Sequence, residues 1–110
     1  MLNLFTKRGD TFAEVPFQIN VNAVPLNLSG ALIRMQLRTD YGGKVYLEFT
    51  SLNNDGITIT NPTNGEFKIN ETIIDLEAKS YKYDIEITLS NGEVKTWIQG
   101  TFNVSNDVTR

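Results

Sequence analysis

Strict alternation of apolar and polar residues over 80–104 constrains this chain more than any other feature. The stretch reads SYKYDIEITLSNGEVKTWIQGTFNV and contains a reversal signal at Asn91-Gly92. Alternation with a period of two indicates a β-strand with one buried face. Asn-Gly between two such runs indicates a hairpin with a two-residue type I′ turn. The chain is therefore expected to end in a long β-hairpin.

The predicted turn sets the register of this hairpin. The expected inner pairs are Leu89–Val94, Ile87–Thr96, Ile85–Ile98, Tyr83–Gly100 and Tyr81–Phe102. On the outer face, Trp97 then lies opposite Glu86. The only tryptophan of the chain is thus predicted to point outward from a polar face. Either a partner protein covers it, or it packs within the chain against the 71–80 connection or the terminal arm.

The same alternation recurs in shorter runs along the chain. The inward sets are Ala13, Val15, Phe17, Ile19 and Val21; Ala31, Ile33, Met35 and Leu37; Val45, Leu47 and Phe49; Ile57 and Ile59; Phe67 and Ile69. Turn signals separate these runs at Gly42-Gly43, Asp55-Gly56 and Asn64-Gly65. Pro16 cannot donate to a ladder, so its strand is expected at a sheet edge or at a bulge. Only 71–79 resists a strand interpretation, and one short helical turn is expected there.

Seven or eight short strands with turns about every ten residues indicate an all-β antiparallel sandwich. A barrel is the alternative, and the 71–80 connection, which resembles a crossover between two sheets, favours the sandwich. At 110 residues the chain is expected to form a single domain, 1–110. A tyrosine near the start of the penultimate strand often bonds back to the preceding corner. Tyr81 or Tyr83 could do so, or could be an ordinary core residue.

Composition excludes several kinds of function. The net charge of −3 weighs against a nucleic-acid binder that neutralises phosphates. Without cysteine, the chain has no disulfides or thiolate metal sites, and without histidine it lacks the commonest general base and metal ligand. No apolar run is long enough for a signal peptide or a membrane span. We therefore expect no enzyme activity, no cofactor, no metal, no nucleic-acid partner and no membrane partner.

Three short motifs invite functional interpretations, and each has a simpler structural one. Arg8-Gly9-Asp10 matches an integrin-binding tripeptide but is expected to be a turn. Residues 53–55 resemble part of a calcium loop but lack its ligand spacing and its terminal glutamate. Asp84 and Glu86 share a strand face, which is expected to be a solvated stripe.

The candidate binding residues lie on the predicted outer faces. Arg34 and Arg38 project from one strand with Gln36 between them, and Tyr41, Tyr46 and Trp97 are the aromatics on the exposed side. Tyr41 could be only a turn residue. Because tryptophan and arginine are enriched in interface hot spots, the candidate interface consists of Trp97, Glu86, Arg34, Arg38 and Tyr46.

Four stretches together resemble a known group of proteins: RGDTF, LNLSGALIRMQLR, YKYDIEI with NGEVKTWIQGTFNV, and the closing DVTR. They are similar to small immunoglobulin-like β-sandwich proteins encoded among phage and prophage structural genes, including the N-terminal domain of siphophage baseplate upper proteins. The resemblance spans nearly the whole chain and rests on turns and strand patterns. It implies a virion component associated with the tail or baseplate and assembled in the bacterial host cytoplasm. It also implies other phage structural proteins as partners, a possible homo-oligomer and no catalytic residues.

A carbohydrate-binding or host-adhesion module is the alternative function. Such a module predicts a groove lined by several aromatics, whereas an assembly protein predicts flat sheet faces and edges. One clear outward tryptophan, rather than a row of aromatics, favours assembly.

Overall fold

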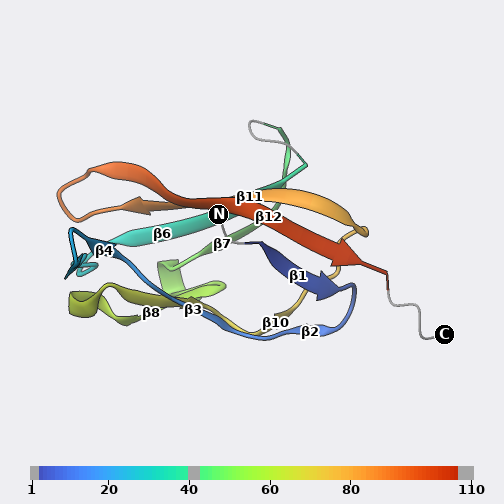
Figure 1. Ribbon diagram of the computed structural model, residues 1–110, viewed down its shortest axis with the longest axis horizontal. Coiled ribbons are helices and arrows are strands. Elements are labelled where there is room, and N and C mark those ends of the chain that lie inside the picture. The colour runs from blue at the N-terminus through green and yellow to red at the C-terminus, as the bar shows by residue number, and fades with distance from the viewer. Residues whose placement is uncertain (1–2, 40–42, 107–110) are drawn as a thin grey trace.

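The computed structural model describes residues 3–39 and 43–106 of the chain (Figure 1). Tyr41, half of the predicted Gly42-Gly43 turn and the closing DVTR lie outside the described residues. The described part contains twelve strands: β1 Leu4–Lys7, β2 Thr11–Phe12, β3 Val15–Gln18, β4 Asn20–Val21, β5 Val24–Pro25, β6 Leu32–Arg38, β7 Val45–Thr50, β8 Ile57–Asn61, β9 Glu66–Ile69, β10 Thr72–Ile73, β11 Lys79–Thr88 and β12 Val94–Ser105.

The strands form two layers that enclose one hydrophobic core (Figure 1). One layer is a five-stranded sheet in the order β1-β12-β11-β6-β7, and the other contains the three-stranded sheet β3-β9-β8. The short β2–β10 pair lies in the same layer as β3 (Figure 1). All pairs are antiparallel except β1 with β12, which is parallel. The predicted all-β sandwich is confirmed. The strand count exceeds the expected seven or eight because the 11–25 run is broken into β2, β3, β4 and β5, and because Thr72–Ile73 forms the additional strand β10.

Alternation in the sequence places much of the core, although Ala13, Val21 and Val45, which were expected inward, are exposed. Ile33, Met35 and Leu37 of β6 are fully buried, while their neighbours on the strand face outward. Phe67 and Ile69 of β9 are likewise buried. The rest of the core is formed by Leu4, Phe12, Ile19, Leu28, Phe49, Ile57, Ile74, Tyr81, Tyr83, Ile85, Ile87, Phe102 and Val104. Pro16 lies on β3, an edge strand, as its missing N–H requires.

The helical turn expected within 71–79 is absent. Thr72–Ile73 forms β10 and pairs with β2, and the Ile74 carbonyl accepts a hydrogen bond from the Gly9 N–H at 2.9 Å. Thr72, Ile73 and Ile74 are consecutive β-branched residues, which favour an extended backbone because their side chains are restricted in a helix. The 3₁₀ turns of the described residues lie instead at Leu52–Asn54 and Pro62–Asn64.

The final hairpin has a different turn from the predicted one. Gly92 has φ +89°, but Asn91 is not among the residues with positive φ, so the turn is not type I′. The Gly92 N–H donates to the Leu89 carbonyl, and the Leu89 N–H donates to the Glu93 carbonyl, both at 2.8 Å. This is the three-residue loop in which a type I turn is followed by a left-handed glycine.

The longer loop shifts the register by one residue, and a bulge then restores it. Near the turn, Ile87 pairs with Lys95 and Glu86 pairs with Thr96, so the expected partners there are wrong. Trp97 is the extra residue of a β-bulge. Beyond the bulge the predicted pairs are confirmed: Ile85–Ile98, Tyr83–Gly100 and Tyr81–Phe102.

Tyr81 is the tyrosine that bonds back to the preceding corner. Its hydroxyl donates to the Glu77 carbonyl at 2.7 Å, while the residue itself is only 1% exposed. The contact anchors the start of β11 to the connection that crosses between the two layers.

Candidate functional site

The outward face of the five-stranded sheet carries a row of charged and amide side chains. Because β6 alternates, burying Ile33, Met35 and Leu37 forces Arg34, Gln36 and Arg38 onto the opposite, outward face. The register places Arg34 beside Glu86 of β11, and Gln36 between Asp84 of β11 and Glu48 of β7. We call these six residues, Arg34, Gln36, Arg38, Glu48, Asp84 and Glu86, the outer-face ladder.

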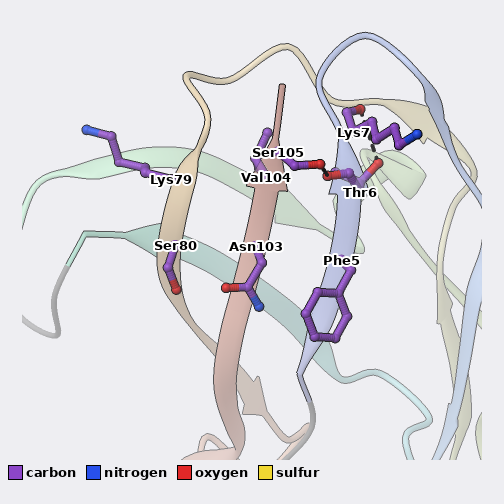
Figure 2. Close-up of a pocket in the computed structure, with 8 residues that line it drawn as sticks. All are labelled: Phe5, Thr6, Lys7, Lys79, Ser80, Asn103, Val104 and Ser105. Carbon is purple, nitrogen blue, oxygen red and sulfur yellow. Dashed lines mark hydrogen bonds between the residues drawn. The ribbon is translucent and has the colours of Figure 1, made fainter. Parts of the chain in front are cut away.

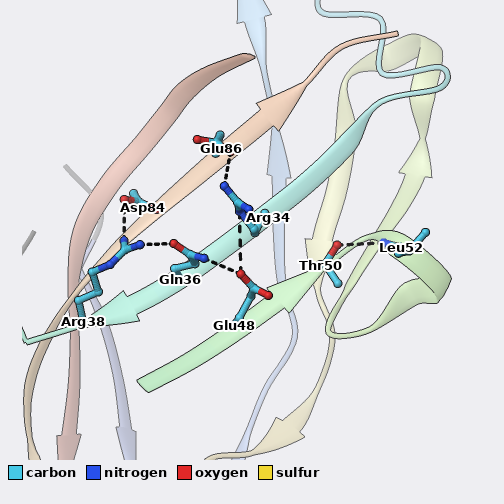
Figure 3. Close-up of polar contacts among 8 residues, drawn as sticks. All are labelled: Arg34, Gln36, Arg38, Glu48, Thr50, Leu52, Asp84 and Glu86. Carbon is cyan, nitrogen blue, oxygen red and sulfur yellow. Dashed lines mark hydrogen bonds and ion pairs between the residues drawn. The ribbon is translucent and has the colours of Figure 1, made fainter. Parts of the chain in front are cut away.

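The members of the ladder are joined by direct contacts (Figure 3). Arg34 Nη2 lies 2.6 Å from Glu86 Oε1, and its Nε lies 3.9 Å from Glu48 Oε2. Gln36 Nε2 donates to Glu48 Oε2 at 2.5 Å. Gln36 Oε1 in turn accepts a hydrogen bond from Arg38 Nη2. The contacts therefore run continuously across β11, β6 and β7.

Arg38 and Asp84 form the most enclosed pair of the ladder. Their side chains are 19% and 23% exposed, against 45% and 46% for Arg34 and Glu48. Arg38 Nη1 lies 3.4 Å from Asp84 Oδ2, and Arg38 Nε donates to the Gly43 carbonyl at 3.0 Å. Exposed ion pairs stabilise a fold by only about 0.2–1 kcal/mol each. The main physical effect of the ladder is to hold long side chains in defined positions on the outward face of the sheet.

The structure brings together three of the five predicted interface residues: Arg34, Arg38 and Glu86. Glu48 is a ladder member that the sequence analysis missed. Its place opposite Gln36 could have been found by pairing the alternation of β7 with that of β6. Asp84 was predicted as part of a solvated stripe, and the structure pairs it with Arg38 instead.

Trp97 does not lie on the outward face, and the prediction that it does is wrong. The extra residue in the bulge interrupts the alternation of β12, so Trp97 is half-buried and packs against the hydrophobic core. Lys95 Nζ lies 4.7 Å from the centre of its indole ring. The indole Nε1–H is buried and has no hydrogen-bond partner in the described part of the chain. Glu86, expected beside Trp97, faces Thr96 instead.

Tyr46 is also displaced by a bulge. On β7, Leu47 pairs with Leu37 and Val45 pairs with Arg38, so Tyr46 is the extra residue between them. Its ring meets the buried Tyr81 ring edge-on, with 5.7 Å between the ring centres. Tyr46 remains 40% exposed, and Lys44 and Lys79 lie 5.2 and 5.8 Å from its ring. It is therefore separate from the outer-face ladder.

A shallow hollow of about 460 Å³ lies on β1, β11 and β12 (Figure 2). Its lining consists of Phe5, Thr6, Lys7, Lys79, Ser80, Asn103, Val104 and Ser105. Phe5 is 69% exposed, the largest exposed fraction among the big apolar side chains of the described residues. The lining therefore includes two lysines, hydroxyl groups, one amide and one aromatic ring, and the Lys79 side chain points away from that ring (Figure 2). The sequence analysis missed Phe5, although the alternation of LFTK could have placed it outward.

The remaining motifs have structural roles. Arg8-Gly9-Asp10 is a turn in which Gly9 has φ +83° and Arg8 Nε lies 2.9 Å from Asp75 Oδ1. The 53–55 stretch belongs to the turn before Gly56. Within residues 3–39 and 43–106, no three acidic side chains gather closely enough to hold a metal ion. The same residues include no helix with the length and apolar character needed to cross a membrane.

Comparison with known proteins supports the fold. No protein-family profile matches the chain, and no curated protein matches it. Among solved structures, it is similar to CopC from Methylosinus trichosporium OB3b, with a TM-score of 0.54 and 13% sequence identity. The match covers 98% of this chain and 88% of CopC. At this identity the similarity shows the fold alone, which is an all-β sandwich.

Proposed function

We propose that this protein is a non-enzymatic structural component of a phage or prophage virion, associated with the tail or baseplate, that acts through protein–protein assembly. The resemblance of RGDTF, LNLSGALIRMQLR and the final hairpin to such proteins supports this assignment. Assembly in the host cytoplasm and contact with other virion proteins follow from the same resemblance.

The outer-face ladder is the observation that carries the proposal. Three acidic and two arginine side chains contact one another on the outward face of the sheet. Interleaved charges of both signs favour a partner with the complementary pattern and disfavour others, which is how charged surfaces provide specificity. An open sheet face with ordered side chains suits docking to another folded subunit better than enclosing a small molecule.

Immunogold labelling of purified particles tests the proposal. Antibodies raised against the protein should label the tail or baseplate of particles released from the strain that encodes it. Particles without label would contradict the virion assignment. The double variant Arg34→Glu/Arg38→Glu should reduce incorporation, because it reverses both cations of the ladder. Lys68→Glu, on the opposite sheet where Lys68 contacts Glu14 at 2.9 Å, is the matched control and should incorporate normally.

Exposed aromatics do not favour the carbohydrate-binding alternative. Phe5 and Tyr46 are the exposed aromatics of the described residues, and they lie on the opposite edge strands β1 and β7 of the same sheet. They cannot form one stacking platform for a sugar ring. A glycan array probed with the purified protein would reverse this preference if it showed specific binding.

A further inference from the structure

The open edges of the five-stranded sheet differ in how well they resist strand pairing. Most of β7 and the 94–99 part of β12 have no neighbouring strand on one side among the described residues. Each carries a bulge with an aromatic beside a lysine: Tyr46 with Lys44, and Trp97 with Lys95. Bulges and edge lysines are the usual means by which proteins prevent edge-to-edge association. These two edges are therefore protected.

Strand β1 forms the remaining edge, and although it ends in Lys7 it lacks the bulge that interrupts pairing at the other two edges. Its four residues pair with β12 in unbroken register, from Leu4–Phe102 to Lys7–Ser105. The strand contains no bulge and no proline. Its outward residue Phe5 is 69% exposed. A regular edge with an exposed aromatic at its middle is open to another strand.

Hydrogen bonds to the backbone of β1 show which of its peptide groups face β12. Asn103 Nδ2 donates to the Leu4 carbonyl at 3.3 Å, and Ser105 Oγ donates to the Thr6 carbonyl at 3.5 Å. Farther along, the Arg8 N–H donates to the Ser105 carbonyl at 2.8 Å. The even-numbered residues of this segment therefore turn their peptide groups toward β12.

The peptide groups of Phe5 and Lys7 consequently face the open edge, because successive residues of a strand point to opposite sides. The Lys7 carbonyl accepts a hydrogen bond from the Asp10 N–H at 3.1 Å. Among residues 3–39 and 43–106, the N–H and carbonyl of Phe5 have no hydrogen-bond partner, and they face the space beside β1. That space is a groove of about 510 Å³ lined by 3–7 and 10–15.

We propose that β1 pairs with β1 of a second copy of this chain, antiparallel and about a two-fold axis at Phe5. The two Phe5 residues then exchange both N–H···O bonds, as one hydrogen-bonded pair of an antiparallel ladder does. Their rings lie side by side on the outward face, where each covers the other. Lys7 faces Asn3 of the second copy, so the two Lys7 side chains stay apart. Such an interface uses the same patch on both subunits, as closed two-fold dimers require.

This inference deepens the assembly function proposed above and rests on it. The pairing joins two five-stranded sheets edge to edge, so two outer-face ladders would lie on one continuous surface. Because the shared strand is short, the dimer is expected to be weak in isolation and to need support from neighbouring subunits.

Cysteine cross-linking provides the direct test. The chain has no native cysteine, and a hydrogen-bonded antiparallel pair separates its Cα atoms by about 5.5 Å, which a disulfide can span. Phe5→Cys should therefore form a covalent dimer under mild oxidation. Ile73→Cys is the control, since Ile73 is 63% exposed on the other layer. Equal cross-linking rates for the two variants would overturn the proposal.

Sedimentation of the parent protein provides the second test. As the protein concentration rises from about 10 µM to about 1 mM, a range that covers weak dissociation constants, the mean mass should rise toward that of a dimer. Phe5→Ser should weaken this association by about tenfold or more, the loss typical of a central interface residue, while Ile73→Ser leaves it unchanged. A parent that stays monomeric throughout would refute the pairing. If the protein is monomeric but antibodies still detect it in particles, the pairing is refuted and the virion function stands. If it forms the dimer but is absent from particles, only the virion function is refuted.

Discussion

Trp97 offers the sharpest test of how the final hairpin packs, because its position depends on a single bulge. The outward position predicted from alternation implies that Trp97→Ala leaves the fold intact and weakens association. The packed position implies the reverse. In the structure the indole lies against the core, while its Nε1–H is buried without a hydrogen-bond partner among the described residues. These two features act on stability in opposite directions, so two substitutions can separate them.

Trp97→Ala removes the ring and should destabilise the fold. Truncating a fully buried tryptophan or phenylalanine costs about 3–5 kcal/mol, and a half-buried ring should cost about half of that. Loss of the Lys95 contact adds about 0.5 kcal/mol to this cost. Removal of the buried, unpaired indole N–H offsets about 1 kcal/mol of it. The net cost should be about 1–2 kcal/mol. For a domain of this size, that lowers the melting temperature by roughly 4–10 °C.

Trp97→Phe keeps an aromatic ring at the bulge and removes the unpaired donor. Its stability should lie within about 1 kcal/mol of the parent. Thermal unfolding followed by circular dichroism measures both variants, since the fluorescence of the only tryptophan is lost in each. Two results would refute the reasoning. An unchanged melting temperature for Trp97→Ala would show that the ring does not pack on the core. An equal loss in both variants would show that the indole N–H has a partner.

Local geometry predicts the effects of three other substitutions. Gly56→Ala should cost about 3 kcal/mol or more, because φ is +95° and the new Cβ would lie 2.4 Å from the Phe49 ring. Gly92→Ala, at φ +89° with no atom within 4 Å, should cost only about 1–2 kcal/mol. Urea unfolding compares the two, and equal costs would show that the clash is relieved freely. Tyr81→Phe should cost about 1 kcal/mol, because the Glu77 carbonyl loses its donor. Burial raises the pKa of Tyr81 because it disfavours the charged phenolate. The neutral Tyr81 hydroxyl therefore contributes its full stability below about pH 10, and this contribution is lost as the pH rises through the raised pKa of the folded state. The parent should therefore lose stability above about pH 10 more steeply than Tyr81→Phe does, and parallel pH profiles would contradict this.

Much of the fold was predictable because it depends on local alternation. Burying Ile33, Met35 and Leu37 requires only that a strand present every second residue to one face. The same rule places Arg34 and Arg38 outward. Two members of the candidate site therefore follow from the alternation of β6 alone.

The 72–74 segment shows where local pattern was insufficient. Thr72 and Ile73 have no alternating neighbours, and they become a strand only because β2 lies beside them. Pairing between distant segments supplied the hydrogen bonds that a short helical turn would otherwise have formed within itself. Sequence periodicity contains no information about such a neighbour.

The bulges show the same limit at the candidate site. Alternation by itself determined that 80–104 is a hairpin with Ile85 and Tyr83 in the core. Only the tertiary structure decided that the loop has three residues and that Trp97 is an extra residue turned toward the core. The physical reason is that each one-residue shift of register would carry a whole strand face from the core to solvent. The loop makes one such shift and the bulge at Trp97 cancels it, so the energy of the packed core, and not the local pattern, selects where the bulge lies.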